Sequence, residues 1–247
     1  MDQAVFHPLH SASCAVVCSR CNLREICLPV GLTQAELDHV DRVLVSHRRP
    51  LRQGDSLYRP GASFEAVYAV RTGFFKTTRT ANDGREQVIG FHMGGELLGL
   101  DGIGTGRHET QAVALEDSQV CVIPFHELER LSQQLPGLQQ EFHRVMSREI
   151  VRKEGVMLLM GSRQAEARVA AFVLNLTHRL QARGFSASSL VLRMTRQEIG
   201  SYLGLTLETV SRTLSKFQAE GLLHVRGRQV RITDAVGLQD VLDGAVP

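Results

Sequence analysis

The sequence predicts an α+β fold in which a short cysteine-rich segment precedes a domain of short strands, a long helix and a small C-terminal domain. Three observations support this prediction. Four of the five cysteines lie within 14–27, glycine turns separate short apolar runs over 50–124, and helical periodicity without such turns begins at Phe125. A chain of 247 residues is long enough for two domains. We expect the parts to cover residues 1–30, 31–136, 137–165 and 166–247.

The stretch SCAVVCSRCNLREICLPV holds Cys14, Cys18, Cys21 and Cys27, whereas Cys121 lies far downstream. No basic region followed by an apolar run marks a signal peptide, and no segment approaches the roughly 18 apolar residues of a membrane span. We therefore expect a soluble, cytoplasmic protein with no membrane partner. In that reducing compartment, clustered cysteines more often bind metal than form disulfides. Iron–sulfur clusters and structural zinc both take four thiolates, so the spacing leaves both groups open.

Two segments define the first domain. Residues 33–45 place apolar side chains at helical spacing behind a threonine N-cap, and Glu36 stands at the capping-box position, so a short helix is expected. Over 50–124, runs such as VYAV, QVIGF and QVCVI alternate with turns such as RTG, ANDG and GIGTG. Strands of four to six residues separated by glycine turns favour an antiparallel β-barrel or β-roll.

A long helix is expected after Phe125, with residues at alternating steps of four and three. This a/d spacing packs a helix against an identical one. The seam would comprise Met146, Ile150, Lys153, Met157, Met160 and Gln164. Packing against the β-domain of the same chain explains a short apolar stripe equally well. In a symmetric homodimer Lys153 would face its own copy, and Gly155 weakens the helix, so such a dimer would lie close to dissociation.

The C-terminal part contains a helix-turn-helix pattern. Thr195 and Glu198 form a capping box for a first helix, Gly204 suits a left-handed turn residue, and Thr206 caps a second helix. The segment LLHVRGRQVRIT then predicts a basic β-hairpin, the wing. From Arg168 onward the chain has ten Lys and Arg against six Asp and Glu, a net +4, although the whole chain carries +2. This charge favours double-stranded DNA as the partner.

A recognition helix presents its N-terminal turns to base edges in the major groove. Glu208, Ser211 and Arg212 lie in those turns and are expected to read bases, because Arg can bond guanine and Glu can accept from cytosine. Glu208 and Arg212 are also four apart, so a surface ion pair is the alternative. Five cations are expected to contact phosphates, and the alternative for each of them is a solvated surface position. They are Arg196, Lys216, Arg226, Arg228 and Arg231.

Four stretches, CAVVCSRCNLREICLP, GFHMGGELLGLDGIG, SQVCVIPF and LGLTLETVSRTL, resemble the FNR branch of the CRP/FNR transcription regulators. The resemblance implies a cyclic-nucleotide-binding-like β-roll, a long dimerisation helix and a C-terminal winged helix-turn-helix. It implies one oxygen-labile 4Fe-4S cluster per subunit on Cys18, Cys21, Cys27 and Cys121, with Cys14 outside the ligand set. It also implies a dimer that, with its cluster intact, binds a TTGAT-type inverted repeat and activates anaerobic genes, contacting RNA polymerase around residues 82–86.

The sequence departs from the cyclic-nucleotide-binding relatives of that branch, which follow GEL with an Arg-Ser or Arg-Thr pair. Here His108, Glu109 and Thr110 occupy the corresponding stretch, so no cyclic nucleotide site is expected. No G-x-G-x-x-G fingerprint follows a strand, so an enzyme is not expected. His92, His108 and His126 are expected to be packing or surface residues. The alternative function is a zinc-stabilised CRP-like regulator of another small effector.

Overall fold

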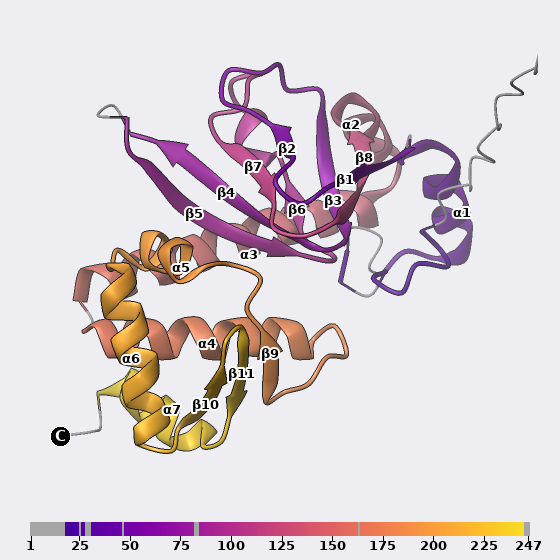
Figure 1. The fold of residues 1–247 in the computed structure, drawn as a ribbon. Coiled ribbons are helices and arrows are strands. Elements are labelled where there is room, and N and C mark those ends of the chain that lie inside the picture. The colour runs from indigo at the N-terminus through magenta and orange to yellow at the C-terminus, as the bar shows by residue number, and fades with distance from the viewer. Residues whose placement is uncertain are drawn as a thin grey trace, which may run out of the picture.

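The computed structural model describes residues 18–24, 26–27, 31–45, 47–81, 84–162 and 164–244. Cys14 and residues 82–83 of the predicted polymerase contact lie outside the described residues. Figure 1 shows a β-roll above a C-terminal domain of helices and a small sheet. Helix α1 (Gln34–Val43) and the described cysteine segment lie at one end of the roll, and the helix-turn-helix lies at the opposite side of the molecule.

The roll consists of two four-stranded antiparallel sheets, in the orders β1-β8-β3-β6 and β2-β7-β4-β5. Phe75 and Val120 are fully buried in its interior, which confirms the predicted β-roll. The strands are β1 (His47–Leu51), β2 (Ser56–Tyr58), β3 (Ala66–Thr72), β4 (Phe74–Thr80), β5 (Glu86–Met93), β6 (Leu97–Leu98), β7 (Gln111–Ala114) and β8 (Ser118–Pro124).

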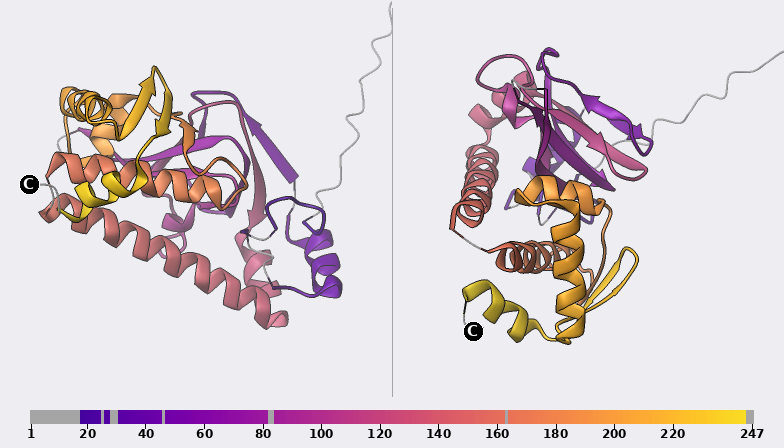
Figure 2. Two further views of the ribbon diagram at one scale, coloured as in Figure 1. Left: turned by 90° about the horizontal axis from the view of Figure 1, so that it is seen from below. Right: turned by 60° about the vertical axis from the view of Figure 1, so that its left-hand side comes forward.

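The helical stretch after the roll divides into α2 (Phe125–Gln134), α3 (Pro136–Ser162) and α4 (Ala165–Gln181). Leu135 is extended because a following proline disfavours the helical conformation, and this residue separates α2 from α3. With 27 residues, α3 is about 40 Å long and runs the length of the molecule beside the roll (Figure 2). Gln164 is extended and occupies the N-cap position of α4, beyond the end of α3, so the predicted seam was wrong to include it.

The C-terminal domain confirms the predicted helix-turn-helix and wing. It comprises α5 (Arg196–Leu203), α6 (Leu207–Ala219), the hairpin β10 (Leu223–Arg226) and β11 (Gln229–Ile232), and α7 (Ala235–Asp243). The sequence did not predict β9 (Ser189–Val191), which pairs antiparallel with β11 and makes the wing a three-stranded sheet.

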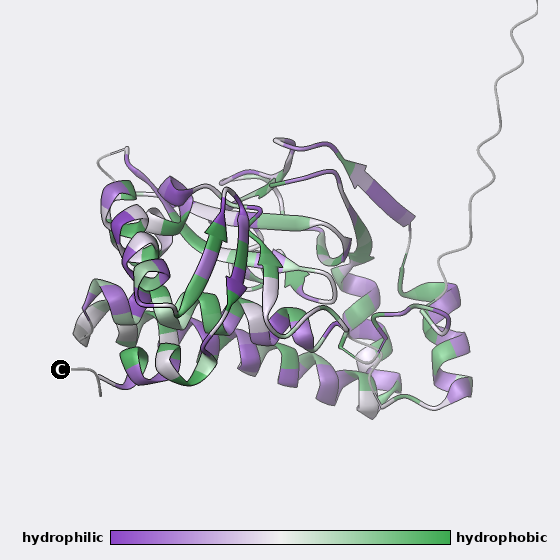
Figure 3. Ribbon diagram, turned by 60° about the horizontal axis from the view of Figure 1, so that its bottom comes forward, coloured by the Kyte–Doolittle hydropathy of each residue, from purple (hydrophilic) through white to green (hydrophobic). Residues whose placement is uncertain are grey.

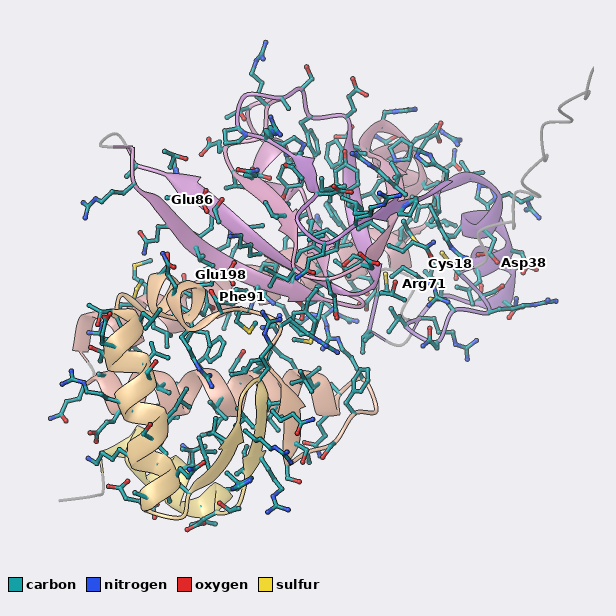
Figure 4. All side chains as sticks on the ribbon, viewed as in Figure 1. Cys18, Asp38, Arg71, Glu86, Phe91 and Glu198 are labelled. Atoms are coloured by element: carbon teal, nitrogen blue, oxygen red, sulfur yellow. The ribbon has the colours of Figure 1, made fainter. Side chains whose placement is uncertain are left out.

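The C-terminal domain shares a core with the roll. Phe91 of β5 lies edge-on to Tyr202 of α5 and to Phe172 of α4, at centroid distances of 5.1 and 6.0 Å. Figure 4 labels Phe91 and Glu198 at this junction, where Lys76 of β4 forms a 2.9 Å ion pair with Glu198 of α5. One apolar core therefore continues from the roll into the C-terminal domain.

A buried polar cluster adjoins this core. The carboxylate of Glu96 accepts hydrogen bonds from Arg152 of α3 and from Arg179 and Arg183 at the end of α4. Burial would raise the pKa of Glu96, but the three arginines lower it to about 2. Neighbouring His92 is buried, and burial together with the charge of Arg152 lowers its pKa to about 3. The cluster therefore holds a charged carboxylate and a neutral imidazole at neutral pH.

We expect the free energy of unfolding to fall as the pH drops below about 6.5. The unfolded chain then protonates His92 near its ordinary pKa of 6.5, which the folded chain does not do until about 3. Below about 4.5 the unfolded chain also protonates Glu96, whereas the ion-paired carboxylate of the folded chain stays charged until about 2, so the free energy of unfolding falls further. Each proton that only the unfolded chain binds lowers the free energy of unfolding by about 1.4 kcal/mol per pH unit. Thermal unfolding followed by circular dichroism should show this decline, and His92→Gln should flatten its upper part; an unchanged slope in that variant would contradict the assignment to His92.

Candidate functional site

Four cysteines that are far apart in the sequence line one small cavity. Cys18, Cys21 and Cys27 come from the N-terminal loop, and Cys121 comes from the middle of β8. The cavity has a volume of about 30 Å³, and its remaining wall is mainly apolar. All four residues carry thiols rather than disulfides and are partly buried. The structure thus brings together the four predicted metal ligands.

The position of Cys121 follows from the sheet. Strand β8 lies between β1 and β3, with Cys121 opposite Arg48 on one side and Ala69 on the other. Because side chains alternate along a strand, Val120 points into the core of the roll while Cys121 faces the N-terminal loop. The fixed sheet therefore supplies a rigid fourth thiol to a loop that carries the other three.

Asp41 of α1 anchors the start of the cysteine loop. Its carboxylate accepts hydrogen bonds from the backbone N–H of Cys18 and from both the backbone N–H and the hydroxyl of Ser19, the latter at 2.6 Å. Within the loop, Cys21 N–H donates to the Cys18 carbonyl and Cys27 N–H donates to the Leu23 carbonyl. Asp41 was not predicted from the sequence, although it lies on the first helix after the cysteines, close enough along the chain to be a candidate partner of the loop.

Arginines surround the thiols. Arg71 donates to Cys21 Sγ at 3.2 Å, and Figure 4 shows Arg71 and Cys18 at the same end of the roll. Burial raises the pKa of Cys121, and the charge of Arg48 opposes that rise. Burial and the neighbouring Cys27 raise the pKa of Cys18 to about 12. The loop thiols therefore disfavour charge on one another unless a cation binds between them.

The donor set fits a thiolate-bound metal group. Thiolates are the ligands of iron–sulfur clusters and of structural zinc, and guanidinium groups beside them offset their negative charge. Within the described residues, no three His, Cys, Asp or Glu side chains lie close enough together to hold a single metal ion. What the structure provides is four thiols around one cavity.

The helix-turn-helix follows the predicted local rules. Thr195 and Glu198 form the capping box of α5, and Thr206 caps α6. Gly204 is left-handed, with φ of 64°. Gly200 must also be glycine, because a Cβ there would come within 2.6 Å of the Leu205 carbonyl oxygen. These residues hold α5 and α6 in the close arrangement that presents α6 outward.

The predicted base-reading residues lie together on the first turns of α6. Glu208 and Arg212 are exposed, and Ser211 is partly buried between them. A hydrogen bond from its own backbone N–H and one from Thr206 lower the pKa of Glu208, so its carboxylate is an acceptor at neutral pH. This arrangement offers one acceptor and one bidentate donor to a groove edge.

The predicted phosphate contacts differ in their surroundings. Arg226, Arg228 and Arg231 are exposed on the wing. Arg196 donates to the Gly227 carbonyl at 3.1 Å and so braces the wing turn, while its buried Nη1 has no hydrogen-bond partner among the described residues. Lys216 forms a 2.7 Å ion pair with Glu166 of α4, which a phosphate would have to replace.

Helix α3 exposes an apolar stripe. Ile150 and Met157 of the predicted seam are 58 % and 65 % exposed, and Leu158 beside them is 72 % exposed. Hydrophilic and hydrophobic residues alternate along this helix in Figure 3. Lys153 is also exposed, whereas Met146 packs against the core of the roll. The middle of α3 therefore has an apolar surface that its own β-domain leaves uncovered.

His108, Glu109 and Thr110 form the stretch in which no phosphate anchor was expected, and a side chain of the roll itself occupies the hydrogen-bond donors of this stretch. One carboxylate oxygen of Asp101 accepts hydrogen bonds from the backbone N–H groups of Glu109 and Thr110, both at 2.9 Å, and from the Thr110 hydroxyl. His108 stacks on Tyr58 at 3.9 Å and is buried, in agreement with a packing role. These backbone donors are thus already used by a negative group, which an anionic ligand would have to displace.

Comparisons with known proteins agree with this architecture. A family model for the cyclic nucleotide-binding domain matches residues 48–135, and one for the Crp-like helix-turn-helix domain matches residues 167–241. No helix in the described ranges is long and apolar enough to cross a membrane.

Several characterised regulators are similar over nearly the whole chain. The transcriptional regulatory protein btr of Bordetella pertussis is 47 % identical over 92 % of this chain and 94 % of its own. The transcriptional activator protein FnrA of Stutzerimonas stutzeri is 44 % identical over 93 % of both chains. The fumarate and nitrate reduction regulatory protein of Escherichia coli is 41 % identical over 94 % of this chain and 92 % of its own.

Among solved structures, FixK2 from Bradyrhizobium japonicum is 33 % identical, with a TM-score of 0.73 over 80 % of this chain and 98 % of that chain. Regulators of this kind bind DNA and act as dimers, and they are not enzymes. The extent of these matches, together with the roll, the long helix and the winged helix-turn-helix, shows that the chain belongs to the CRP/FNR family of DNA-binding transcription regulators.

Proposed function

We propose that this regulator senses oxygen through a 4Fe-4S cluster held by Cys18, Cys21, Cys27 and Cys121. The observation that carries the proposal is the position of Cys121, which β8 places at the cavity lined by the three loop cysteines. The FNR-named relatives, similar over more than nine-tenths of the chain, support the same cofactor. When bound, the cluster supplies an oxygen-labile connection between the loop and the roll.

Residues at the two ends of this connection determine how the cysteine loop is positioned relative to the roll. Asp41 fixes one end of the loop to α1, and Cys121 gives its sulfurs a fixed partner in the sheet. When all four cysteines bind the cluster, the loop is held against the roll. When none of them does, the backbone turns within the loop and the hydrogen bonds to Asp41 remain to hold the loop in place. A cofactor that exists in one state and not in the other supplies the free-energy difference that a switch requires.

The controlled event is pairing of two chains along α3, followed by DNA binding. In the dimer the exposed stripe around Ile150 and Met157 packs against its copy, and two α6 helices stand about 34 Å apart, one turn of DNA. Glu208, Ser211 and Arg212 then read a TTGAT-type inverted repeat. The wing cations contact phosphates, and the protein acts mainly as an activator that meets RNA polymerase beside the promoter.

The cofactor is tested by metal analysis of protein purified without oxygen. We expect iron and acid-labile sulfide in equal amounts, together with a brown colour. Stoichiometric zinc in a colourless protein would overturn the cluster and favour the zinc-stabilised regulator instead.

Replacing Lys153 is expected to strengthen the dimer in air. In a parallel pair the two Lys153 ammonium groups repel each other across the seam, so Lys153→Ala should lower the monomer–dimer dissociation constant by about tenfold. Sedimentation velocity measures this constant. Arg148→Ala removes an exposed cation of the same helix that lies outside the predicted seam, so it is the control and should leave the constant unchanged. Equal constants for Lys153→Ala and the parent would remove Lys153 from the mechanism.

A further inference from the structure

The described cysteine loop and the recognition helix α6 lie at opposite sides of the molecule, so a signal between them needs a physical connection (Figures 1 and 2). Glu96 lies where the parts meet. Its side chain is 11 % exposed, and its two carboxylate oxygens accept hydrogen bonds from Arg179 at 2.6 and 3.0 Å, from Arg183 at 2.8 Å and from Arg152 at 3.2 Å. One residue of the roll thus joins the dimerisation helix α3 to α4, the first helix of the DNA-binding domain.

The turn that carries Glu96 lies directly beneath the cysteine loop. A Cβ added to Gly95 would come within 2.8 Å of Ile26, and one added to Gly94 within 3.3 Å of Leu23. Both apolar side chains belong to the loop between Cys21 and Cys27. Ile26 packs so closely on Gly95, which also has a positive φ of 85°, that a Cβ there would force a shift, and Leu23 lies in close contact with Gly94. A movement of the loop therefore changes the packing of this turn.

The same turn is fixed on its other sides. Gly95 N–H donates to the Val70 carbonyl of β3 at 2.8 Å, and Val70 N–H donates to the Glu96 carbonyl at 2.9 Å. Arg183 donates through Nε to the Gly94 carbonyl as well as through Nη2 to Glu96. The turn is thus held between the loop and the end of α4, with little freedom to absorb a displacement locally.

The ion pairs between Glu96 and the three arginines, here called the joint, favour one relative position of these side chains. Three guanidinium groups converge on one carboxylate in a poorly solvated place, where an unpaired charge is costly. A shift of Glu96 therefore favours a matching shift of the arginines rather than loss of the ion pairs. Since Arg152 belongs to α3 and Arg179 to α4, both helices follow.

We propose that Glu96 is a positioning residue for DNA binding, which couples the packing of the cysteine loop to the orientation of α3 and α4. The identity of the loop as the oxygen-sensing element rests on the proposed function. The mechanical coupling of Ile26 to DNA binding through Glu96 rests on the contacts described above and holds for any ligand that fixes the loop.

A double-mutant cycle tests the coupling on the full-length, anaerobically purified protein. The variants are Ile26→Ala, Glu96→Gln and the pair, and the dissociation constant is measured for a palindromic TTGAT duplex. We expect each single change to weaken binding by about tenfold and the pair to be no weaker than Glu96→Gln alone, because the loop no longer acts once the joint is lost. Multiplying losses, about a hundredfold for the pair, would overturn the proposal.

Lys76→Met is the matched control, because it removes an ion pair between the roll and α5 that is buried to a similar degree, at 18 % exposure of each side chain. Its losses should multiply with those of Ile26→Ala. Glu96→Asp should restore part of the affinity, which a role in bulk packing alone would not predict. If Glu96→Gln does not fold, Arg183→Gln takes its place in the cycle.

Metal content, measured separately for each variant, distinguishes the two proposals. A parent protein without iron would overturn the oxygen-sensing function and leave the coupling intact. Multiplying losses in a protein that does contain iron would overturn the coupling and leave the sensing function intact.

Discussion

Replacing Cys121 by alanine is expected to abolish cluster binding and sequence-specific DNA binding together. The loop keeps three thiols, but the sheet no longer contributes a ligand, so the proposed connection between the loop and β8 through the cluster is lost. Specific DNA affinity should fall about 10³-fold, toward the level of non-specific binding. Iron content, the visible absorption spectrum and titration of a palindromic duplex under anaerobic conditions measure the three effects.

Two controls separate loss of a ligand from loss of the fold. Cys121 is only partly buried, so the thermal midpoint of the Cys121→Ala variant without metal should stay close to that of the parent without metal. Cys14→Ala should retain the cluster, because the resemblance places Cys14 outside the ligand set. If Cys14→Ala loses its iron and Cys121→Ala keeps its iron, the ligand assignment is wrong.

Arg212→Ala is expected to weaken specific DNA binding by about 2–6 kcal/mol per dimer, because each of two recognition helices loses a bidentate contact to a base. Arg212 is exposed on the first turns of α6, so the fold should be unaffected. The loss should be confined to duplexes that carry the correct base at one position of each half-site. Titration of a set of duplexes with single-base changes gives this discrimination directly.

Arg228→Ala on the wing is the matched comparison, because it removes a cation that is expected to contact only phosphate. It should weaken all duplexes equally and reduce the slope of log affinity against log salt by about one per subunit. If Arg212→Ala also weakens all sequences equally, Arg212 contacts the backbone and the base-reading assignment fails.

Local features of the fold followed from sequence. The capping boxes at Thr33 and Thr195, the left-handed Gly204 and the cap at Thr206 were predicted and confirmed. Each depends on residues within four positions of one another, where hydrogen-bond chemistry and backbone sterics decide the outcome. The roll followed for the same reason, since its turns and apolar runs are local signals.

Features set by tertiary pairing did not follow from sequence. The spacing of the N-terminal cysteines left zinc and iron–sulfur ligation open, and the resemblance to FNR-type regulators was needed to include Cys121, which β-pairing brings to the site. Asp41, Arg71 and Glu96 act through partners that lie from about 20 to nearly 90 residues away. No local periodicity marks such contacts, because folding alone brings their partners together.

The seam on α3 shows the same limit. Its periodicity was visible, but spacing cannot show where a helix ends, and Gln164 lies beyond a break that the pattern crosses. Nor does spacing show that Met146 packs on the roll while Ile150 is exposed. A periodic stripe identifies apolar residues, and the surrounding fold decides what covers each of them.

The most direct test follows the visible absorption and the DNA affinity of one anaerobically purified sample during exposure to air. We expect the brown absorption to bleach while DNA binding and the dimer fraction fall in step with it. A colourless sample that carries zinc, or a brown one that bleaches while its DNA affinity stays constant, would contradict an oxygen-controlled connection between the cysteine loop and DNA binding.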